Sequence, residues 1–228
     1  MEFNSLDQRL SLLPERALYW HERRTLLIAD PHFGKAATFR SAGIPVPRGT
    51  TTTDLIRLDA ALSATGAERL VFLGDLLHAR SGRAAATLDA VADWRSRYQQ
   101  LEIVLVRGNH DRSAGDPPDC WDFSCVKGPV TEGPFVFAHE PAESASGYVL
   151  SGHLHPCVRL DDGIGPGIRA ACFWFGPRTA VLPAFGSFTG AHRVRPCQGD
   201  RVFAVGPDCV VEVNYEVTTR RRAARQPR

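Results

Sequence analysis

Histidine, aspartate and asparagine residues follow five short apolar segments of this 228-residue chain. In the segment YVLSGHLH, residues 148–155, two histidines stand one residue apart directly after an apolar run. Imidazole, carboxylate and amide groups can bind divalent metal ions and transfer protons during hydrolysis. The side chains that we consider for such chemistry are Asp30, His32, Asp75, Asn109, His110, Asp111, His139, His153 and His155.

Convergence of these side chains would require a cation. A single histidine after a strand is more often an ordinary surface residue than a metal ligand. Several imidazoles and carboxylates on one rim, however, would lose hydration and repel one another unless a cation bound among them. The set therefore indicates a pair of divalent metal ions, and its mixed nitrogen and oxygen donors suit Mn²⁺, Fe or Zn. The absence of cysteine from these motifs argues against a structural zinc site.

Two features of the backbone are expected to position the ligands. Residues i and i+2 of an extended chain point to the same side, so we expect His153 and His155 to face the metals together, as Asp30 and His32 would. Glycines close to the ligands would allow a close approach of the backbone, although glycine also commonly ends a strand. These glycines are Gly74, Gly108 and Gly152.

Five apolar runs rich in Val, Ile, Leu and Phe are predicted to be the buried strands that carry these side chains at their ends. In open α/β sheets, ligands bind at the carboxyl ends of the strands. The five runs cover residues 24–30, 69–75, 102–110, 134–140 and 148–155. Further strands are indicated at residues 171–176, 179–186, 201–206 and 209–213.

Helical patterns separate the first three runs. One helix is predicted to begin at Thr53 or Asp54, because leucines recur from there at a spacing of three to four. A second helix is predicted over residues 84–98. This order of elements, followed mainly by strands, predicts an α/β fold with a mixed sheet or two stacked sheets and the helices outside.

The composition is that of a globular protein, with 43% hydrophobic and 23% charged residues. No apolar run approaches the roughly 20 residues of a membrane-spanning helix. The N-terminal sequence lacks the basic and then apolar order of a secretory signal, so we expect a cytoplasmic protein. The six cysteines form no CxxC pair, and we expect reduced, mostly buried thiols.

The chain is expected to form one domain over residues 1–217. Residues 218–228 are rich in arginine and have no apolar pattern. We expect this basic tail to be disordered and solvated, with contact to nucleic acid as the alternative.

The motifs ADPH, LGD, RGNHD, AHE and SGHLH, in this order between Asp30 and His155, resemble the signature of the calcineurin-like metallophosphoesterases. The stretches FGKAATFRSAGIPVPRGT, GDLLHAR, ACFWFG and VLPAFGSFTG resemble one bacterial subgroup, the ligase-associated DNA damage response endonucleases, over about residues 13–213. The resemblance implies a four-layer αββα sandwich, in which two mixed β-sheets are flanked by helices.

The resemblance also implies how the metals would be held. One ion would be bound by Asp30, His32, Asp75 and His155. The second ion would share Asp75 and be bound by Asn109, His139 and His153. The chain departs from many family members at Pro31 and Glu140, but neither departure removes a ligand.

Two such ions, most favourably Mn²⁺, can activate a bridging hydroxide for in-line attack at phosphorus. His110 is expected to stabilise the developing charge or to protonate the leaving oxygen, and a purely structural role is the alternative. Asp111 is expected to orient His110, or instead to cap the turn.

Three functions remain open from the sequence. The subgroup resemblance implies a DNA endonuclease or phosphodiesterase in DNA repair that acts on single strands, with a DNA ligase, a nuclease and a helicase as associated proteins and a homodimer as a possible assembly. A hydrolase of small phosphoesters such as nucleotides or cyclic nucleotides would use the same site, and an inactive interaction scaffold is the third reading. Residues 173–175 can stack on bases or fill the core. The candidate substrate-binding residues are His78, Arg40, Arg80, Arg107 and Arg112.

Overall fold

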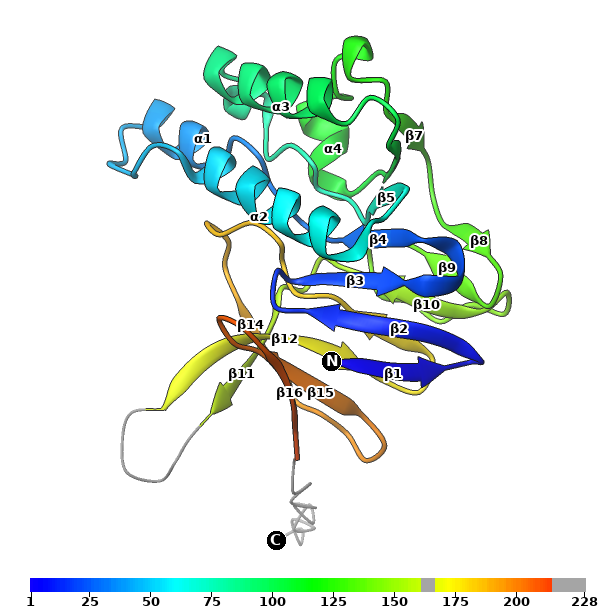
Figure 1. Cartoon of the computed structure of the whole chain (residues 1–228). Coiled ribbons are helices and arrows are strands. Elements are labelled where there is room, and N and C mark those ends of the chain that lie inside the picture. The colour runs from blue at the N-terminus through cyan, green and yellow to red at the C-terminus, as the bar shows by residue number, and fades with distance from the viewer. Residues whose placement is uncertain (161–166, 215–228) are drawn as a thin grey trace, which may run out of the picture.

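Two mixed β-sheets form the centre of the computed structural model, which describes residues 1–160 and 167–214 (Figure 1). The strands of the first sheet lie in sequence order. They are antiparallel up to the fourth strand and parallel from there on. The strands are β1 (Glu2–Ser5), β2 (Gln8–Leu13), β3 (Ala17–Trp20), β4 (Thr25–Ile28), β5 (Arg69–Phe72), β6 (Glu102–Val106) and β7 (Ser124–Val126).

The second sheet contains the remaining described strands, with the order β14-β11-β12-β13-β10-β9-β8. Strand β15 pairs with β12 and carries β16 on its other side. At its centre β10 runs parallel to both β9 and β13. The strands are β8 (Val130–Glu132), β9 (Phe135–Phe137), β10 (Tyr148–Ser151), β11 (Pro156–Leu160), β12 (Ile168–Phe175), β13 (Thr179–Val181), β14 (His192–Arg193), β15 (Arg201–Val205) and β16 (Val210–Val213).

The described helices gather on the side of the first sheet (Figure 1). The α-helices are α1 (Lys35–Ser41), α2 (Thr50–Thr65), α3 (Ala85–Arg97) and α4 (Asn109–Ala114), and the short 3-10 helices are η1 (His21–Arg23), η2 (Arg80–Gly82) and η3 (Asp119–Trp121). None of them combines the length and apolarity needed to span a bilayer.

The prediction of a helix over residues 84–98 is confirmed by α3, but the predicted start of the preceding helix is wrong. Helix α2 begins at Thr50 rather than at Thr53 or Asp54, because Gly49 takes up a left-handed conformation with φ of 89° just before it. Asp54 lies one turn inside the helix, where its buried carboxylate accepts hydrogen bonds from the backbone N–H of Ser187.

Two hydrophobic cores hold the layers together. One lies between α2, α3 and the first sheet and contains buried residues of all three, among them Leu58, Trp94 and Phe72. The other lies between the two sheets, where Trp20 packs edge-on against Phe135. The α/β fold with two mixed sheets and outer helices is therefore confirmed, and the described α-helices pack on the first sheet.

Several local predictions need correction. Every one of the five site-bearing strands is shorter than its apolar run, because the polar residues at the end of each run leave the sheet. Phe173 and Phe175 are buried between the sheets, which excludes them as base-stacking platforms, and only Trp174 is partly exposed. All six cysteines are free thiols as expected, yet only Cys157 and Cys172 are buried. The basic tail predicted at residues 218–228 lies outside the described residues.

The N-terminal strands β1–β3 and helix α1 were not anticipated from the sequence. Charged and polar residues interrupt the apolar pattern of residues 2–20, so the alternation that marks a half-buried antiparallel strand is weak there. In the structure these three strands extend the first sheet by antiparallel pairing from β4. They widen the platform from which the site residues project.

Candidate metal centre

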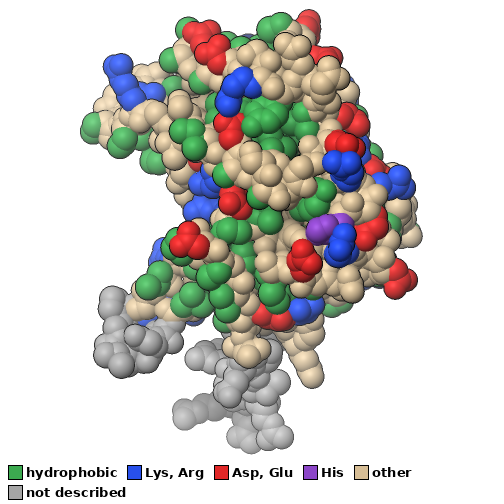
Figure 2. Space-filling model, viewed as in Figure 1, with side chains coloured by type: hydrophobic (Ala, Val, Ile, Leu, Met, Phe, Trp, Pro, Cys, Tyr) green, Lys and Arg blue, Asp and Glu red, His purple; other side chains and the backbone are tan. Residues whose placement is uncertain are grey.

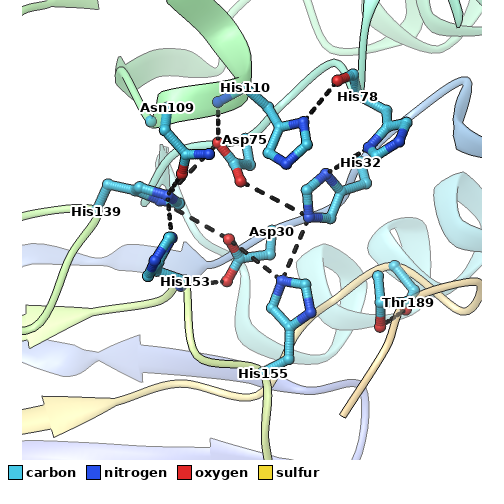
Figure 3. Close-up of polar contacts among 12 residues, drawn as sticks. Asp30, His32, Asp75, His78, Asn109, His110, His139, His153, His155 and Thr189 are labelled. Carbon is cyan, nitrogen blue, oxygen red and sulfur yellow. Dashed lines mark hydrogen bonds and ion pairs between the residues drawn. The ribbon is translucent and has the colours of Figure 1, made fainter. Parts of the chain in front are cut away.

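The predicted ligands meet where strands of both sheets end (Figure 3). Asp30 and His32 follow β4, Asp75 follows β5, and Asn109 begins α4 directly after β6. From the second sheet, His139 follows β9, whereas His153 and His155 follow β10. Parallel neighbouring strands present their carboxyl ends at the same edge of a sheet. Residues separated by more than 120 positions in the sequence therefore come into contact.

Five of these ligands have left-handed backbone conformations. Their φ angles are 52° for Asp30, 46° for His32, 55° for Asp75, 70° for His153 and 49° for His155. The extended geometry that we expected for the pairs 30/32 and 153/155 is therefore wrong, although both members of each pair do reach the site. Such conformations are uncommon outside glycine and are concentrated at functional sites.

Asp30, His32 and His155 form the first donor group, which we call site 1. The Nε2 atoms of His32 and His155 lie 3.3 Å apart, and His155 Nε2 lies 3.7 Å from Asp30 Oδ1. The other carboxylate oxygen of Asp30 accepts a hydrogen bond of 2.7 Å from the backbone N–H of His153. This bond fixes the carboxylate, and Oδ1 stays directed at the histidines.

Asp75, His139 and His153 form the second donor group, site 2, and Asn109 joins it. Nδ1 of His139 donates to the Leu73 carbonyl at 3.0 Å, so Nε2 of the neutral ring carries a lone pair. That lone pair faces Asn109 Oδ1 at 2.8 Å, His153 Nδ1 at 3.1 Å and Asp75 Oδ1 at 3.5 Å. Electron-rich atoms directed at one point in this way are stabilised by a cation.

Asp75 lies between the two sites. Its Oδ2 is 3.7 Å from His32 Nε2 of site 1, and its Oδ1 is 3.5 Å from His139 Nε2 of site 2. Oδ1 also accepts a hydrogen bond of 2.9 Å from the backbone N–H of His110. The carboxylate is therefore placed to contact ions in both sites.

The residues present fit a pair of divalent cations. The side chains of Asp30 and Asp75 are 0% and 2% exposed, and in the described part of the chain their close ion-pair contacts are with histidines only. Asp30 Oδ1 is buried and has no hydrogen-bond partner among the described residues. Two buried carboxylates without a lysine or arginine in ion-pair contact are costly unless metal ions neutralise them.

Burial also favours the neutral, ligand form of His32. It lowers the pKa of His32, and the neighbouring His155 lowers it further. Burial likewise lowers the pKa of His78 to about 4. For Asp75 burial raises the pKa, which the nearby His139 opposes. A neutral imidazole has the lone pair that metal coordination needs.

Three glycines allow the loops to approach the ligands. A Cβ atom at Gly152 would lie 2.5 Å from Asp30 Oδ2, and one at Gly108 would collide with Asp75 Oδ1. Gly152 and Gly108 are therefore required by the close packing of the ligands, as the sequence suggested. At Gly74, a Cβ would collide with the His139 ring.

His110 is held beside site 1 by contacts that the sequence did not indicate. Its Nδ1 donates to the His78 carbonyl at 2.7 Å, which leaves Nε2 as the free ring nitrogen. The ring stacks on that of His78 with centroids 4.7 Å apart, and it lies 4.9 Å from the ring of His32. His78 in turn contacts His32 through their Nδ1 atoms at 3.3 Å. His78 thus orients both neighbouring rings.

Asp111 does not orient the His110 ring, contrary to our expectation. Its buried carboxylate accepts backbone hydrogen bonds from Gly108 and Asp75 at 2.8 Å and from Leu76 at 2.9 Å, with a longer one of 3.4 Å from Leu77. Burial raises the pKa of Asp111, and these N–H groups oppose that rise. Asp111 therefore ties the loop of Asp75 to the loop of Asn109.

The arginines considered for substrate binding have different surroundings. Arg107 forms a two-pronged ion pair with Asp116 at 2.6 and 2.7 Å, and Arg40 of α1 donates to carbonyls of the loop that follows this helix. Arg80 and Arg112 are both exposed, and Arg80 donates a hydrogen bond to the Ser113 carbonyl. Arg80 and Arg112 remain candidates for contact with substrate.

Lys35 is a candidate that the sequence reasoning missed. It is the first residue of α1, and burial lowers its pKa while the charges of Asp75 and Asp30 oppose that change. The chain contains only two lysines, and its other Lys/Arg residues are arginines. The position of Lys35, three residues after His32, was therefore the sequence signal that could have identified it as a site residue. A half-buried ammonium group beside the two donor groups can bind a phosphate oxygen.

Comparison with solved structures identifies a close relative. Nuclease MPE of Pseudomonas putida is similar to this chain with a TM-score of 0.83 and 41% sequence identity, over 93% of this chain and 99% of that chain. Yfce, a phosphoesterase from E. coli, aligns over 83% of this chain and 97% of its own with a TM-score of 0.40 and 18% identity, a similarity too low to support an inference. No family model and no curated protein match the chain.

Proposed function

This chain belongs to the calcineurin-like metallophosphoesterases and is a metal-dependent phosphoesterase, and on that premise we propose that it is a nuclease that hydrolyses phosphodiester bonds of single-stranded DNA. The similar protein from Pseudomonas putida is a nuclease. The observation that carries the proposal is the position of Asp75 between two donor groups, within 3.7 Å of His32 and 3.5 Å of His139. Two-metal sites of this kind are used by nucleases and phosphatases.

We propose that site 1 and site 2 each bind one divalent ion, with Mn²⁺ favoured and Fe or Zn also suited to the donors. The ligands of the first ion would be Asp30, His32, Asp75 and His155, and those of the second would be Asp75, Asn109, His139 and His153. When bound, such a pair supplies an activated water for attack at phosphorus and charge stabilisation for the attacking and leaving oxygens.

The protein's own groups supply orientation and protons. The backbone N–H of His110 and the N–H of His153 hold the two carboxylates in place. The His110 ring is fixed through Nδ1–H to the His78 carbonyl, and in its imidazolium form Nε2–H would stabilise the developing charge or give its proton to the leaving oxygen. Lys35, His78, Arg80 and Arg112 are proposed to contact the phosphates of the substrate.

A role in DNA repair, and association with a DNA ligase, a nuclease and a helicase, are proposals that rest on the subgroup resemblance. The same holds for a homodimer. These proposals concern the setting of the reaction and do not change the chemistry of the site.

Substrate preference tests the proposed function. The manganese-loaded protein is expected to cleave single-stranded oligonucleotides, with slower turnover of bis-p-nitrophenyl phosphate and of nucleotides. Good turnover of the small esters together with failure on every DNA substrate would replace the proposal by a small-molecule phosphoesterase. Absence of bound metal by elemental analysis after manganese incubation would instead point to an inactive scaffold.

Two substitutions separate metal binding from catalysis. Asp75→Asn should reduce the content of both ions, because Asp75 faces both sites. His110→Ala should keep the metal content and lower the hydrolysis rate by about 10²-fold or more. His21→Ala, which removes a histidine bonded to Ser11 outside the site, is the matched control. Loss of metal in His110→Ala would contradict the role proposed for this residue.

A further inference from the structure

Strands β11 and β12 form a ribbon that projects from the body of the molecule (Figure 1), and the short strand β14 pairs with the first residues of β11. One face of the ribbon is apolar, where Val158, Cys172 and Val194 pack together in a small core. Side chains alternate between the two faces of a strand. The residues between these apolar positions must therefore point to the opposite face.

That opposite face carries arginines. Residues directly opposed on paired strands point to the same side. Arg169 of β12 is opposed to Arg159 of β11, and Arg193 of β14 is opposed to Cys157, two residues before Arg159. Arg195 lies two residues after Arg193, and the buried Val194 separates these two exposed arginines in the chain. We call Arg169, Arg193 and Arg195 the arginine face.

The three guanidinium groups of the arginine face are available to a ligand. All three residues are exposed. Among residues 1–160 and 167–214, none of the three guanidinium groups takes part in a side-chain hydrogen bond, an ion pair or a ring contact. Arg107 and Arg201, in contrast, are each held by a carboxylate. Guanidinium groups that are not engaged by the protein bind phosphate in a two-pronged geometry.

A cavity of about 180 Å³ connects this face to the metal centre. Its lining includes His155 of site 1, Arg169 of the arginine face, and Arg16 and Thr189 between them. Arg16 is held by weak hydrogen bonds from Nη1 to the carbonyls of Ala184 and Gly186, at 3.3 and 3.5 Å. Thr189 lies on the loop beside His155 (Figure 3).

The surface view agrees with this path. Figure 2 shows the molecule hollowed between the helices and the ribbon, with lysine or arginine side chains in the hollow. The polar residues that line the cavity include Arg16, Arg169 and Thr189 in addition to His155. An extended polyanion with one reacting phosphate at the metals matches this distribution of charge.

The register gives the spacing of the cations. His155 directly precedes β11. Cys157 lies two residues after His155 and is opposed to Arg193. Arg159 lies four residues after His155 and is opposed to Arg169. At about 3.3 Å per residue, these positions are roughly 7 and 13 Å from His155. Arg193 and Arg169 thus lie at increasing distances from the metal centre along β11 and are suited to the phosphates next to the scissile one.

We infer that the cavity and the arginine face bind the backbone of a single strand of nucleic acid on one side of the scissile bond. This inference rests on the proposed function and specifies how the substrate is selected. A strand of several nucleotides contacts the arginine face, whereas a nucleotide or bis-p-nitrophenyl phosphate occupies only the metal centre. The face thereby favours polynucleotides over small phosphoesters.

Binding without turnover tests the inference. The double variant Arg169→Ala/Arg193→Ala and its parent, both manganese-loaded and both carrying His110→Ala to slow hydrolysis, are titrated with a fluorescein-labelled single-stranded oligonucleotide between about 50 and 200 mM NaCl. Two lost phosphate contacts should lower the slope of log K against log salt by about 1.4, at about 0.7 per contact on single strands. The affinity should fall roughly tenfold or more. Arg178→Ala, an exposed arginine beyond the far end of β12, should behave like the parent when made in the same background.

A kinetic readout separates this inference from the proposed function. In the manganese-loaded double variant with His110 intact, KM for the oligonucleotide should rise while turnover of bis-p-nitrophenyl phosphate stays unchanged. If the wild type cleaves DNA but the double variant keeps its affinity and salt slope, the arginine face is not the binding surface and the nuclease function stands. If the wild type neither binds nor cleaves DNA, both proposals fail. Unchanged thermal unfolding of the variant confirms that the fold is intact.

Discussion

The clearest quantitative prediction concerns Asp111, whose carboxylate joins two ligand loops. The substitution Asp111→Ala removes the acceptor of three short backbone hydrogen bonds, from Gly108, Asp75 and Leu76. The bond of 3.4 Å from Leu77 is weak and is left out of the sum. Three N–H groups that were buried against the carboxylate would then lack a partner.

The magnitude follows from these three bonds. Each unsatisfied buried N–H costs about 1 to 3 kcal/mol, and water that enters the space of the lost side chain keeps the value near the lower end. The expected loss in the free energy of unfolding is therefore about 3 to 6 kcal/mol. Since a domain is stable by only about 5 to 15 kcal/mol, this variant would be close to unfolding. Asp111→Asn keeps one acceptor oxygen and should lose about half as much.

Urea unfolding of the metal-free protein measures the effect, followed by metal analysis of the folded fraction. The metal content should fall as well, because the loops of Asp75 and Asn109 are no longer tied together. Asp89→Ala, an exposed aspartate on α3, is the control and should change stability by no more than about 0.5 kcal/mol. A loss below about 1 kcal/mol for Asp111→Ala, or full metal content in Asp111→Asn and Asp111→Ala alike, would refute this reasoning.

Three further predictions concern single residues. Lys35→Met should leave metal content unchanged and lower kcat/KM about tenfold, as measured with an oligonucleotide, because a charge-assisted phosphate contact is lost; an unchanged kcat/KM would remove Lys35 from the site. Gly152→Ala should displace the Asp30 carboxylate, since the added Cβ would lie 2.5 Å from Oδ2; elemental analysis should show reduced metal, and full occupancy would contradict the packing argument. The hydrogen bond from the Arg107 side chain holds the pKa of Asp116 below its usual value. This ion pair therefore stabilises the fold at pH values above the unfolded-state pKa of about 3.9. The stabilisation is lost as the pH falls through the folded-state pKa of Asp116. Asp116→Asn should therefore destabilise the protein by less than about 1 kcal/mol at neutral pH and by nothing in strong acid, and thermal unfolding as a function of pH measures this difference.

The amino-acid sequence determined the kind of chemistry and most of the chemical groups. The types and order of the residues from Asp30 to His155 were enough to indicate two metals, because few other arrangements make several histidines and carboxylates compatible. The buried strands were recognisable because parallel strands of a covered sheet form continuous apolar runs. The helix over residues 84–98 was recognisable from its apolar period.

Tertiary structure alone decided the contacts. The left-handed backbone at His153 and His155 replaces the extended geometry expected from local spacing, and it is imposed by packing between strands of two sheets. The same packing decides that Asp111 accepts backbone N–H groups, since Asp75 lies 36 positions away in sequence. A chain pattern carries no information on which distant loop a carboxylate will meet.

The arginine face illustrates the same limit. Nothing in the sequence distinguishes Arg169 and Arg193 from the many other arginines, and our sequence-based candidates lay near the motifs instead. Only the register of β11 with β12 and β14 places these two side chains on one face beside His155. Local sequence thus specified which groups are present, whereas strand pairing over long sequence distances specified which of them can act together.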